Sequence, residues 1–309
     1  MKKWMVGFVA VCGMVSQLQA AEPAATTAPA TPRPTGGNFV APPPDRVPVC
    51  TRASLQAAAD SYVEAQRTGN PRKMAFSGNA RFLQDMAAVE PARGLWNTAL
   101  KVAATQSILD TTRCKTFTEI VVTEGTPYVI GTRLYVDEDR ITRIDSLVTT
   151  NGDWLFNANN YAHVIKMEDW ATLPAGKRTK AQDMINGANA YLDAFADKHL
   201  DAPWGVPCER TEGGAYTNVK ADPKSTCKVG IPNGVLYIVN RDYVVDEEKG
   251  VVQIFCRFGN SASGMPDSHM FKYVDGKYRY VHTLSVSTAK NSPQIGDYWP
   301  AEAKPAAAK

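Results

Sequence analysis

The sequence predicts an α+β fold in which one order of elements occurs twice. Two amphipathic helical segments, Leu55–Tyr62 and Met184–Phe195, each precede a series of strand-like segments. Both series end in a hairpin, at the turns Asp137–Asp139 and Asp275-Gly276. A leading helix followed by consecutive strands is typical of an α+β unit with an antiparallel sheet. We therefore expect two such units in tandem.

The elements of the first half follow from periodicity. Leu55, Ala58, Ala59 and Tyr62 recur at i, i+3, i+4 and i+7, which gives a helix one apolar face. Asn70-Pro71 should end that helix, because proline cannot continue it. We predict a short strand-like piece at Asn79–Phe82, a second helical stretch at Trp96–Ala104, and strands at Phe117–Thr123, Tyr128–Val136 and Arg140–Thr149.

The second half restarts near Thr179. Thr179 and Gln182 have the spacing of a capping box at a helix start. The dipeptide Asp275-Gly276 favours a two-residue hairpin turn. We predict a helix through Met184, Ala188, Tyr191 and Phe195, then strands at Val235–Val239, Gly250–Phe258, His269–Val274 and Lys277–Ser287.

Local similarity supports an internal repeat. Asn189–Ala194 is similar to Asp60–Ala65 at an offset of 129 residues, and the same offset carries Arg81 onto Arg210. Alignment of the two final hairpins places Asp145 opposite His282.

Residues 1–20 have the parts of a secretory signal peptide. Lys2 and Lys3 precede the apolar stretch Trp4–Val15, and a small residue, Ala20, ends the segment. A membrane span needs about 20 apolar residues, so this stretch is too short to remain as one. We expect a secreted or periplasmic protein without a membrane segment after cleavage. Ala, Pro and Thr dominate residues 21–48, and a similar composition closes the tail 291–309, so both should be disordered.

The charge balance argues against a nucleic-acid partner. The formal net charge is +3, and removal of Lys2 and Lys3 lowers it to +1. There is no run rich in lysine and arginine, which a nucleic-acid-binding surface would require. The sequence leaves the oligomeric state open.

Five of the six cysteines remain after loss of Cys12. No C-x-x-C pair is present, so the spacing does not indicate a zinc site. An oxidising compartment favours disulfides, and we predict the pairs Cys50–Cys114 and Cys208–Cys227, each within one half. Cys256 lies within a predicted strand and should be a buried free thiol.

Two strings in the first half resemble the SnoaL-like and nuclear-transport-factor-2-like proteins: YVEAQRTGNPRKMAFSGNARF and GTRLYVDEDRITRIDSLVT. Longer strings, among them PWGVPCERTEGGAYT and PDSHMFKYVDGKYRYVHTLSV, resemble a family of secreted fungal and bacterial proteins known only as a domain of unknown function. That resemblance extends from about Cys50 to Val286. The likeness to the nuclear-transport-factor-2-like proteins implies a tandem pair of cone-shaped α+β units, each a helix with a curved antiparallel sheet, at residues 49–176 and 177–290. It implies no particular activity, because the cone fold serves several enzyme classes and binding proteins.

The segment Trp204–Thr217 contains candidate ligand-binding residues of the second unit. Arg210 can bind a carboxylate, and Glu212 and Tyr216 lie beside two glycines that allow close backbone approach. An internal Arg210–Glu212 ion pair that orders the loop is the competing interpretation. Arg241, at a predicted loop-to-strand junction, would add a second arginine to the pocket.

Candidate catalytic residues lie on the last hairpin. Across the Asp275-Gly276 turn, His269 should lie opposite Val281–Thr283 and so beside His282. With Asp267, the two imidazoles would form a general acid–base set, or less readily a metal site with two histidines and one carboxylate. Structural roles are the alternative, because a register shift of one residue moves a side chain to the other face. Tyr280, on the face predicted to carry Tyr278 and His282, would line the pocket.

The sequence contains no G-x-S-x-G, P-loop, G-x-G-x-x-G or H-E-x-x-H motif. We therefore expect no cofactor and no bound metal. The hypothesis is a small-molecule pocket in the second unit, with acid–base chemistry (a lyase, isomerase or hydrolase reaction) on a small polar or anionic molecule. The alternatives are a non-catalytic ligand-binding module and a structural or interaction protein.

Overall fold

The computed structural model describes residues 47–228, 230–231, 236–259 and 264–287, which all belong to one compact unit. The predicted signal peptide, the predicted tail and nearly all of the predicted 21–48 linker lie outside these residues. Within them, no helix has the length and apolar character needed to cross a membrane.

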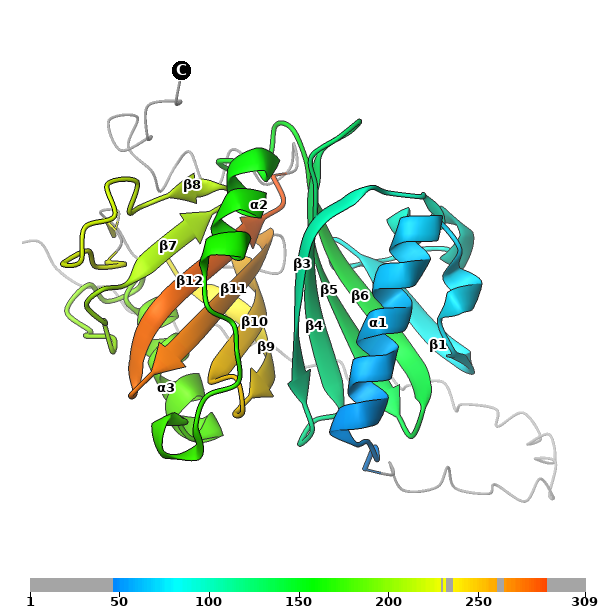
Figure 1. Ribbon diagram of the computed structural model, residues 1–309, viewed down its shortest axis with the longest axis horizontal. Helices are drawn as coiled ribbons and strands as arrows, with labels where there is room; N and C mark the ends of the chain where they lie inside the picture. Colours follow the sequence, from blue (N-terminus) through cyan, green and yellow to red (C-terminus); the bar gives the residue numbers. More distant parts are fainter. Residues whose placement is uncertain (1–46, 229, 232–235, 260–263, 288–309) are drawn as a thin grey trace, which may run out of the picture. The chain divides into compact units, whose positions relative to one another are not determined.

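Two six-stranded sheets form the body of this unit (Figure 1). The first sheet has the order β2-β1-β6-β5-β4-β3 and the second the order β8-β7-β12-β11-β10-β9. In each sheet one neighbouring pair is parallel, β1 with β6 and β7 with β12, and the other pairs are antiparallel. The strands are β1 Phe76–Gln84, β2 Ala87–Ala88, β3 Val102–Asp110, β4 Lys115–Val122, β5 Tyr128–Asp137, β6 Arg140–Thr149, β7 Glu209–Glu212, β8 Ala215–Tyr216, β9 Ile238–Asp246, β10 Val251–Phe258, β11 Met265–Val274 and β12 Lys277–Ser285. The fold is therefore α+β with two mixed sheets, and the strand order is the same in both.

Three α-helices accompany the sheets: α1 Arg52–Thr68, α2 Ala158–Met167 and α3 Ala181–Asp193. Short 3-10 turns are η1 Pro71–Lys73, η2 Pro91–Arg93, η3 Leu95–Asn97 and η4 Ala175–Lys177. Thr51 and Ser54 form a capping box at the start of α1. The prediction of a capping box at Thr179 is wrong, because Lys180 is the N-cap of α3 and makes no side-chain capping bond. The Glu247 carboxylate, from outside the helix, accepts a hydrogen bond from the Ala181 amide at 2.5 Å.

Two predicted elements differ from the structure. The predicted helical stretch Trp96–Ala104 is a 3-10 turn followed by β3, since pairing with β4 overrides the helix propensity of its alanines. The predicted junction around Arg241 lies inside β9, which continues from Ile238 to Asp246.

Each sheet has one face under a helix and one face toward the other sheet. Tyr62 and other α1 residues pack on Ile120, Ile130 and Ile144 of the first sheet. In the same way α3 packs on the second sheet. The remaining faces meet in a shared apolar cluster that includes Phe117, Leu147, Val244, Phe255 and Met270. The described part of the chain is thus layered as helix, sheet, sheet and helix (Figure 1).

Contacts between the sheets are reciprocal. The Val245 amide donates to Asp110 Oδ2 at 2.8 Å, and the Leu109 amide donates to Asp246 Oδ2 at 3.0 Å. Asp110 ends β3, and Asp246 ends β9, the equivalent strand of the second sheet. Such exchange of equivalent partners is the signature of a two-fold interface. The two halves therefore face each other across an approximate two-fold axis.

The register defines which positions are equivalent. Arg133 pairs with Asp145 in the first sheet as Met270 pairs with His282 in the second, so Asp145 and His282 are equivalent, as the hairpin alignment predicted. The turns Asp85-Met86 and Gly213-Gly214 also correspond, each between a longer and a two-residue strand. The correspondence of these two turns makes Glu209, not Arg210, the equivalent of Arg81. The predicted offset of 129 residues applies to helices α1 and α3, but β1 and β7 are related by an offset of 128.

Both predicted disulfides are present. Cys50 is bonded to Cys114, and Cys208 to Cys227. Among the described cysteines Cys256 is free and buried.

Candidate functional site

Tyr191 of α3 lies at the centre of a polar cluster on the helix-covered face of the second sheet. Its ring centroid is 5.5 Å from that of His269, and burial raises its pKa to about 12. Arg210 hydrogen-bonds Tyr191 and forms an ion pair with Glu212 at 2.9 Å. The Trp154 indole donates to the other Glu212 oxygen at 2.6 Å. The structure thus brings together the predicted residues Arg210, Glu212 and His269. Arg210 and Glu212 also form the internal ion pair that was the competing interpretation to ligand binding.

Asp267 and His269 lie beside Cys256 on that face. His269 Nδ1 is 3.1 Å from Asp267 Oδ2, and Cys256 Sγ lies 4.0 Å from each of these atoms. All three side chains are buried. Burial and the Asp267 charge raise the pKa of the Cys256 thiol, so the thiol is neutral.

The register separates His269 from His282. His269 is paired with Thr283, and His282 with Met270, so the two imidazoles lie on opposite faces of the sheet. The predicted acid–base set of both histidines with Asp267, and the alternative two-histidine metal site, therefore do not form. A bulge between Lys272 and Tyr273 also moves Tyr278 to the α3 face, away from Tyr280.

His282 is held between two carboxylates in the space between the sheets. Its Nδ1 is 3.0 Å from Glu119 Oε2, and its Nε2 is 2.7 Å from Glu168 Oε2. Tyr161 donates to the second Glu119 oxygen, and the Trp170 ring packs at 5.0 Å. Burial alone would lower the pKa of His282, but Glu168 and Glu119 outweigh it and raise the pKa to about 10. The imidazole is thus protonated near neutral pH, and a protonated imidazole has no lone pair with which to act as a base.

Of the remaining predicted residues, Tyr280 lies at the edge of the His282 cluster, with its ring centroid 5.6 Å from that of Trp170. Arg241 joins β9 to α3 through Asn189 at 2.9 Å and Asp193 at 2.6 Å. Tyr216 is in β8, beside Glu209. The Tyr280 hydroxyl accepts from the Asp169 amide at 3.2 Å, and its ring lies 4.3 Å from the Arg279 guanidinium carbon.

A cavity between the sheets was not predicted. Its volume is about 230 Å³. Its lining combines three arginines, two aspartates, an amide and three apolar side chains: Arg133, Arg143, Arg257, Asp145, Asp242, Asn240, Leu83, Met86 and Phe255. The charged side chains of this lining sum to +1, which favours an anionic occupant.

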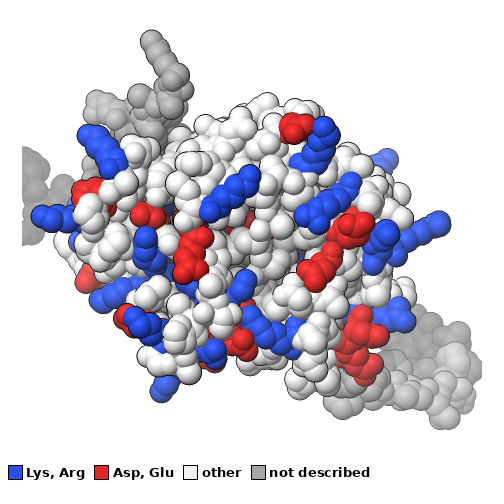
Figure 2. All heavy atoms as spheres, in the orientation of Figure 1, with Lys and Arg blue, Asp and Glu red and all other residues white. Residues whose placement is uncertain are grey.

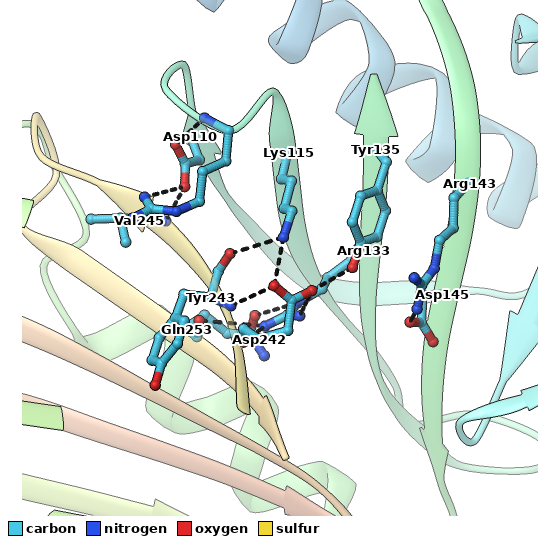
Figure 3. A network of polar contacts seen from close by, with 11 residues as sticks. Asp110, Lys115, Arg133, Tyr135, Arg143, Asp145, Asp242, Tyr243, Val245 and Gln253 are labelled. Carbon is cyan, nitrogen blue, oxygen red and sulfur yellow. Dashed lines mark hydrogen bonds and ion pairs between the residues drawn. The ribbon is translucent and has the colours of Figure 1, made fainter. Parts of the chain in front are cut away.

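Arg143 and Asp145 lie side by side on one wall of this cavity (Figure 3). They form an ion pair through Arg143 Nη2 and Asp145 Oδ2. Arg143 Nε and Asp145 Oδ1 are both buried and have no hydrogen-bond partner among the described residues. Buried polar atoms without partners are rare, because each costs about 1–3 kcal/mol. The donor and the acceptor thus belong to two residues that line the cavity, and neither is satisfied within the described part of the chain.

Arg133 and Asp242 form the other charged wall (Figure 3). Arg133 is buried, donates to Gln253 Oε1 at 2.8 Å and to Asp242 Oδ2 at 3.0 Å, and its guanidinium lies 4.2 Å from the Phe255 ring centroid. Burial alone would raise the pKa of Asp242, but Arg133 and Lys115 lower it to about 2. The charged groups of this wall are therefore partnered within the chain.

Two lining residues have backbone conformations that are uncommon outside glycine. Met86 has a φ of 61° and Asn240 a φ of 57°. Asp85 and Met86 form a two-residue hairpin turn in which glycine is preferred at the second position. Backbone strain of this kind concentrates at functional sites.

The position related to this cavity by the approximate two-fold axis is occupied by side chains. There His282, Glu119 and Met270 stand where the cavity has Asp145, Phe255 and Arg133. Tyr161 of α2 and the following residues Glu168 and Trp170 pack on that place. The cavity thus exists on one side of the axis because α2 and the residues after it cover the other.

A larger cavity of about 440 Å³ lies near the start of α3. Several of its charged groups have partners within the chain. Arg52 is paired with Asp246 at 3.0 Å, Arg113 with Asp110 at 3.2 Å, and Arg178 Nε donates to the Leu173 carbonyl.

The second half of the chain is similar to a known family of domains. Residues 177–285 match a domain of unknown function (DUF8021). This DUF8021 segment contains α3 and the second sheet, and it is the latter part of the span for which the sequence predicted such a resemblance. No curated protein matches the chain. One similar solved structure is an NTF-2-like protein of unknown function from Burkholderia xenovorans LB400, 12% identical, covering 35% of this chain and 85% of that chain with a TM-score of 0.25.

A sequence signal for the cavity existed but was incomplete. Arg133 and Asp145 each stand inside a strand otherwise dominated by apolar residues, and charged residues are rarely buried without a partner. Asp145 could be predicted from the final hairpins as the equivalent of His282. Arg133 could not be predicted as a site residue, because nothing local indicates that Asp242 lies across from it.

Proposed function

We propose that this chain is an exported protein that binds a small polar or anionic molecule in the cavity between its two sheets. The observation that carries the proposal is that two residues lining the cavity, Arg143 and Asp145, each hold a buried polar atom without a partner, Nε and Oδ1. The ligand would present an acceptor, such as a carboxylate or hydroxyl oxygen, to the arginine and a donor to the aspartate. The volume suits a molecule smaller than a typical drug.

Binding without turnover is the role that the geometry favours. General base catalysis by a histidine needs a neutral imidazole near the substrate, and His282 is protonated and enclosed by Glu119 and Glu168. His269 lies on the other face of the sheet. The predicted acid–base reaction therefore gives way to the ligand-binding alternative.

Export and the tandem architecture belong to the same proposal. Two disulfides suit an oxidising compartment, and residues 1–20 resemble a cleaved signal peptide. The shared strand order, with a helix ahead of each sheet, supports two nuclear-transport-factor-2-like cones at residues 49–176 and 177–290. The mixed charges on the face seen in Figure 2 are in keeping with a small-molecule ligand rather than a nucleic acid.

The test is a thermal-denaturation screen against small hydroxy acids, amino acids and sugar acids. A ligand at 100 times its Kd should add about 2.7 kcal/mol to the free energy of unfolding, which raises Tm measurably. The doubly substituted variant Arg143→Gln/Asp145→Asn should lose this rise. Replacing both members avoids leaving one buried charge unpaired.

The matched control is Arg140→Gln/Asp139→Asn, which changes an exposed ion pair of 3.7 Å on the same hairpin. It should keep the full rise in Tm. No ligand in the screen, or an equal rise in both variants, would refute binding in the cavity.

A further inference from the structure

Cys256, Asp267 and His269 converge on one point beneath α3. Cys256 and Asp267 are directly paired across β10 and β11, and His269 follows two residues later on the same face. Their facing atoms are a sulfur, a carboxylate oxygen and an imidazole nitrogen that all lie within 4.8 Å of one another. Their exposed fractions are 0%, 0% and 3%.

The fold does not require polar residues at these positions. The equivalent positions of the first sheet hold Ile120, Ile130 and Thr132, where the isoleucines are part of the apolar core under α1. Burying the Asp267 carboxylate costs free energy that Ile130, at the equivalent position, does not cost. A binding role explains why the second half carries these groups.

The arrangement does not suit a cysteine nucleophile. A catalytic triad uses both ring nitrogens of histidine, one toward the acid and one toward the nucleophile. Here Asp267 and Cys256 both approach Nδ1, at 3.1 Å and 4.0 Å. A thiolate nucleophile is also favoured by a polar, partly exposed site, whereas Cys256 is fully buried.

We propose that Cys256, Asp267 and His269 bind one divalent transition-metal ion of the zinc class. Thiolate, imidazole and carboxylate are the three ligand types that zinc takes in proteins. Around tetrahedral zinc the nitrogen–oxygen distance is about 3.4 Å, and the distance from sulfur to either atom is about 3.6 Å. The observed 3.1 Å and 4.0 Å require shifts of only a few tenths of an ångström.

The surrounding contacts fit this assignment. Asp267 Oδ1 accepts from the Ser285 hydroxyl at 2.8 Å and from the Ser268 amide at 3.1 Å, which leaves Oδ2 to face the metal. Such outer contacts orient a metal-binding carboxylate. Three protein ligands leave the fourth tetrahedral position to a water or a bound ligand.

The experiment is a titration of the metal-free protein with Co²⁺, in a Cys12→Ser background without a histidine tag or reductant. The four cysteines in disulfides cannot supply a thiolate, so Cys256 is then the single free thiol of the chain. We expect one equivalent of Co²⁺ to produce a thiolate-to-cobalt charge-transfer band, which Zn²⁺ abolishes by displacement.

The variants Cys256→Ser and His269→Gln should each weaken cobalt binding by at least about tenfold. Cys256→Ser should also remove the charge-transfer band. His199→Gln, at an exposed histidine, should leave the cobalt affinity and the charge-transfer band unchanged. Absence of the band in the Cys12→Ser protein would overturn the proposal even if the other variants fail to fold. Equal affinity in Cys256→Ser and its parent would overturn it as well.

Discussion

At the scale of single residues, His282 illustrates how a buried charge is stabilised by its neighbours. Both of its ring nitrogens contact carboxylates, and the side chain has no appreciable exposure. A buried ion cluster of this kind is strongly destabilised when one partner is removed, because the remaining charges stay desolvated. His282 is therefore a structural cation between the sheets.

Replacement of His282 by glutamine should lower the free energy of unfolding by about 3–5 kcal/mol, since two buried carboxylates lose their cation. Urea denaturation at pH 7 measures this. His163→Gln, at an exposed site on α2, should change it by less than about 0.5 kcal/mol. Similar small losses in the two variants would show that His282 is not charged in the folded protein.

His282 should also make stability depend on pH. Its folded-state pKa of about 10 lies above the ordinary value of 6.5. Its protonated form therefore stabilises the fold fully below about pH 6.5, and this contribution is lost as the pH rises toward 10. The triple variant Glu119→Gln/Glu168→Gln/His282→Gln should lack this decline in urea denaturation across that range. Parallel pH profiles of the parent and the triple variant would contradict the assignment.

Sequence reasoning found His282 but not its role. Glu119 lies in β4, and Glu168 follows α2, so both partners are more than 100 residues away in the chain. No local pattern indicates that these three side chains meet. By contrast, the Arg210–Glu212 ion pair could be recognised from the sequence, because its two members lie only two residues apart on one strand.

At the scale of elements, the two equivalent hairpin turns differ in what surrounds them. Asp85-Met86 carries a side chain to the cavity wall. Gly213-Gly214 instead lies against the segment before α2, where a Cβ on Gly214 would come within 2.3 Å of the Asn157 carbonyl oxygen. The glycines are needed both for positive φ and for this close approach.

Gly214→Ala should lower the free energy of unfolding by about 1–3 kcal/mol, because strain and the contact with Asn157 act together. The matched control is Gly125→Ala, which has a φ of 69° but open space around the added methyl group. It should cost about 1 kcal/mol from backbone conformation alone. Chemical denaturation of both variants measures the difference, and an equal cost would show that the Asn157 contact is unimportant.

The elements that sequence periodicity located were those with strong local signals. The leading helices and the Asp275-Gly276 turn are present as predicted. The start of β3 was misjudged, because alanine favours a helix and only pairing with β4 makes this segment a strand. The register of β11 and β12 could not be fixed from sequence, since a bulge shifts it at Tyr273.

At the scale of the whole molecule, the shared apolar cluster and the reciprocal aspartate contacts should make the two sheets unfold together. Opening the disulfide Cys50–Cys114 with a double alanine substitution releases a 64-residue loop and should cost about 4 kcal/mol. Hydrogen exchange across a urea series should show β4 and β10 losing protection at the same lowered midpoint. Loss confined to β4 would mean that the sheets unfold independently.

The cavity between the sheets is open on one side of the two-fold axis, and its equivalent on the other side is filled by side chains. This difference has a consequence for assembly. Two identical subunits around a true two-fold axis must carry two identical sites, both open or both closed. A single polypeptide that contains both halves has one connecting segment, and that segment can cover only one of the two places. The connection thus breaks the symmetry: one place is left open as a cavity, while the other is occupied by the chain itself.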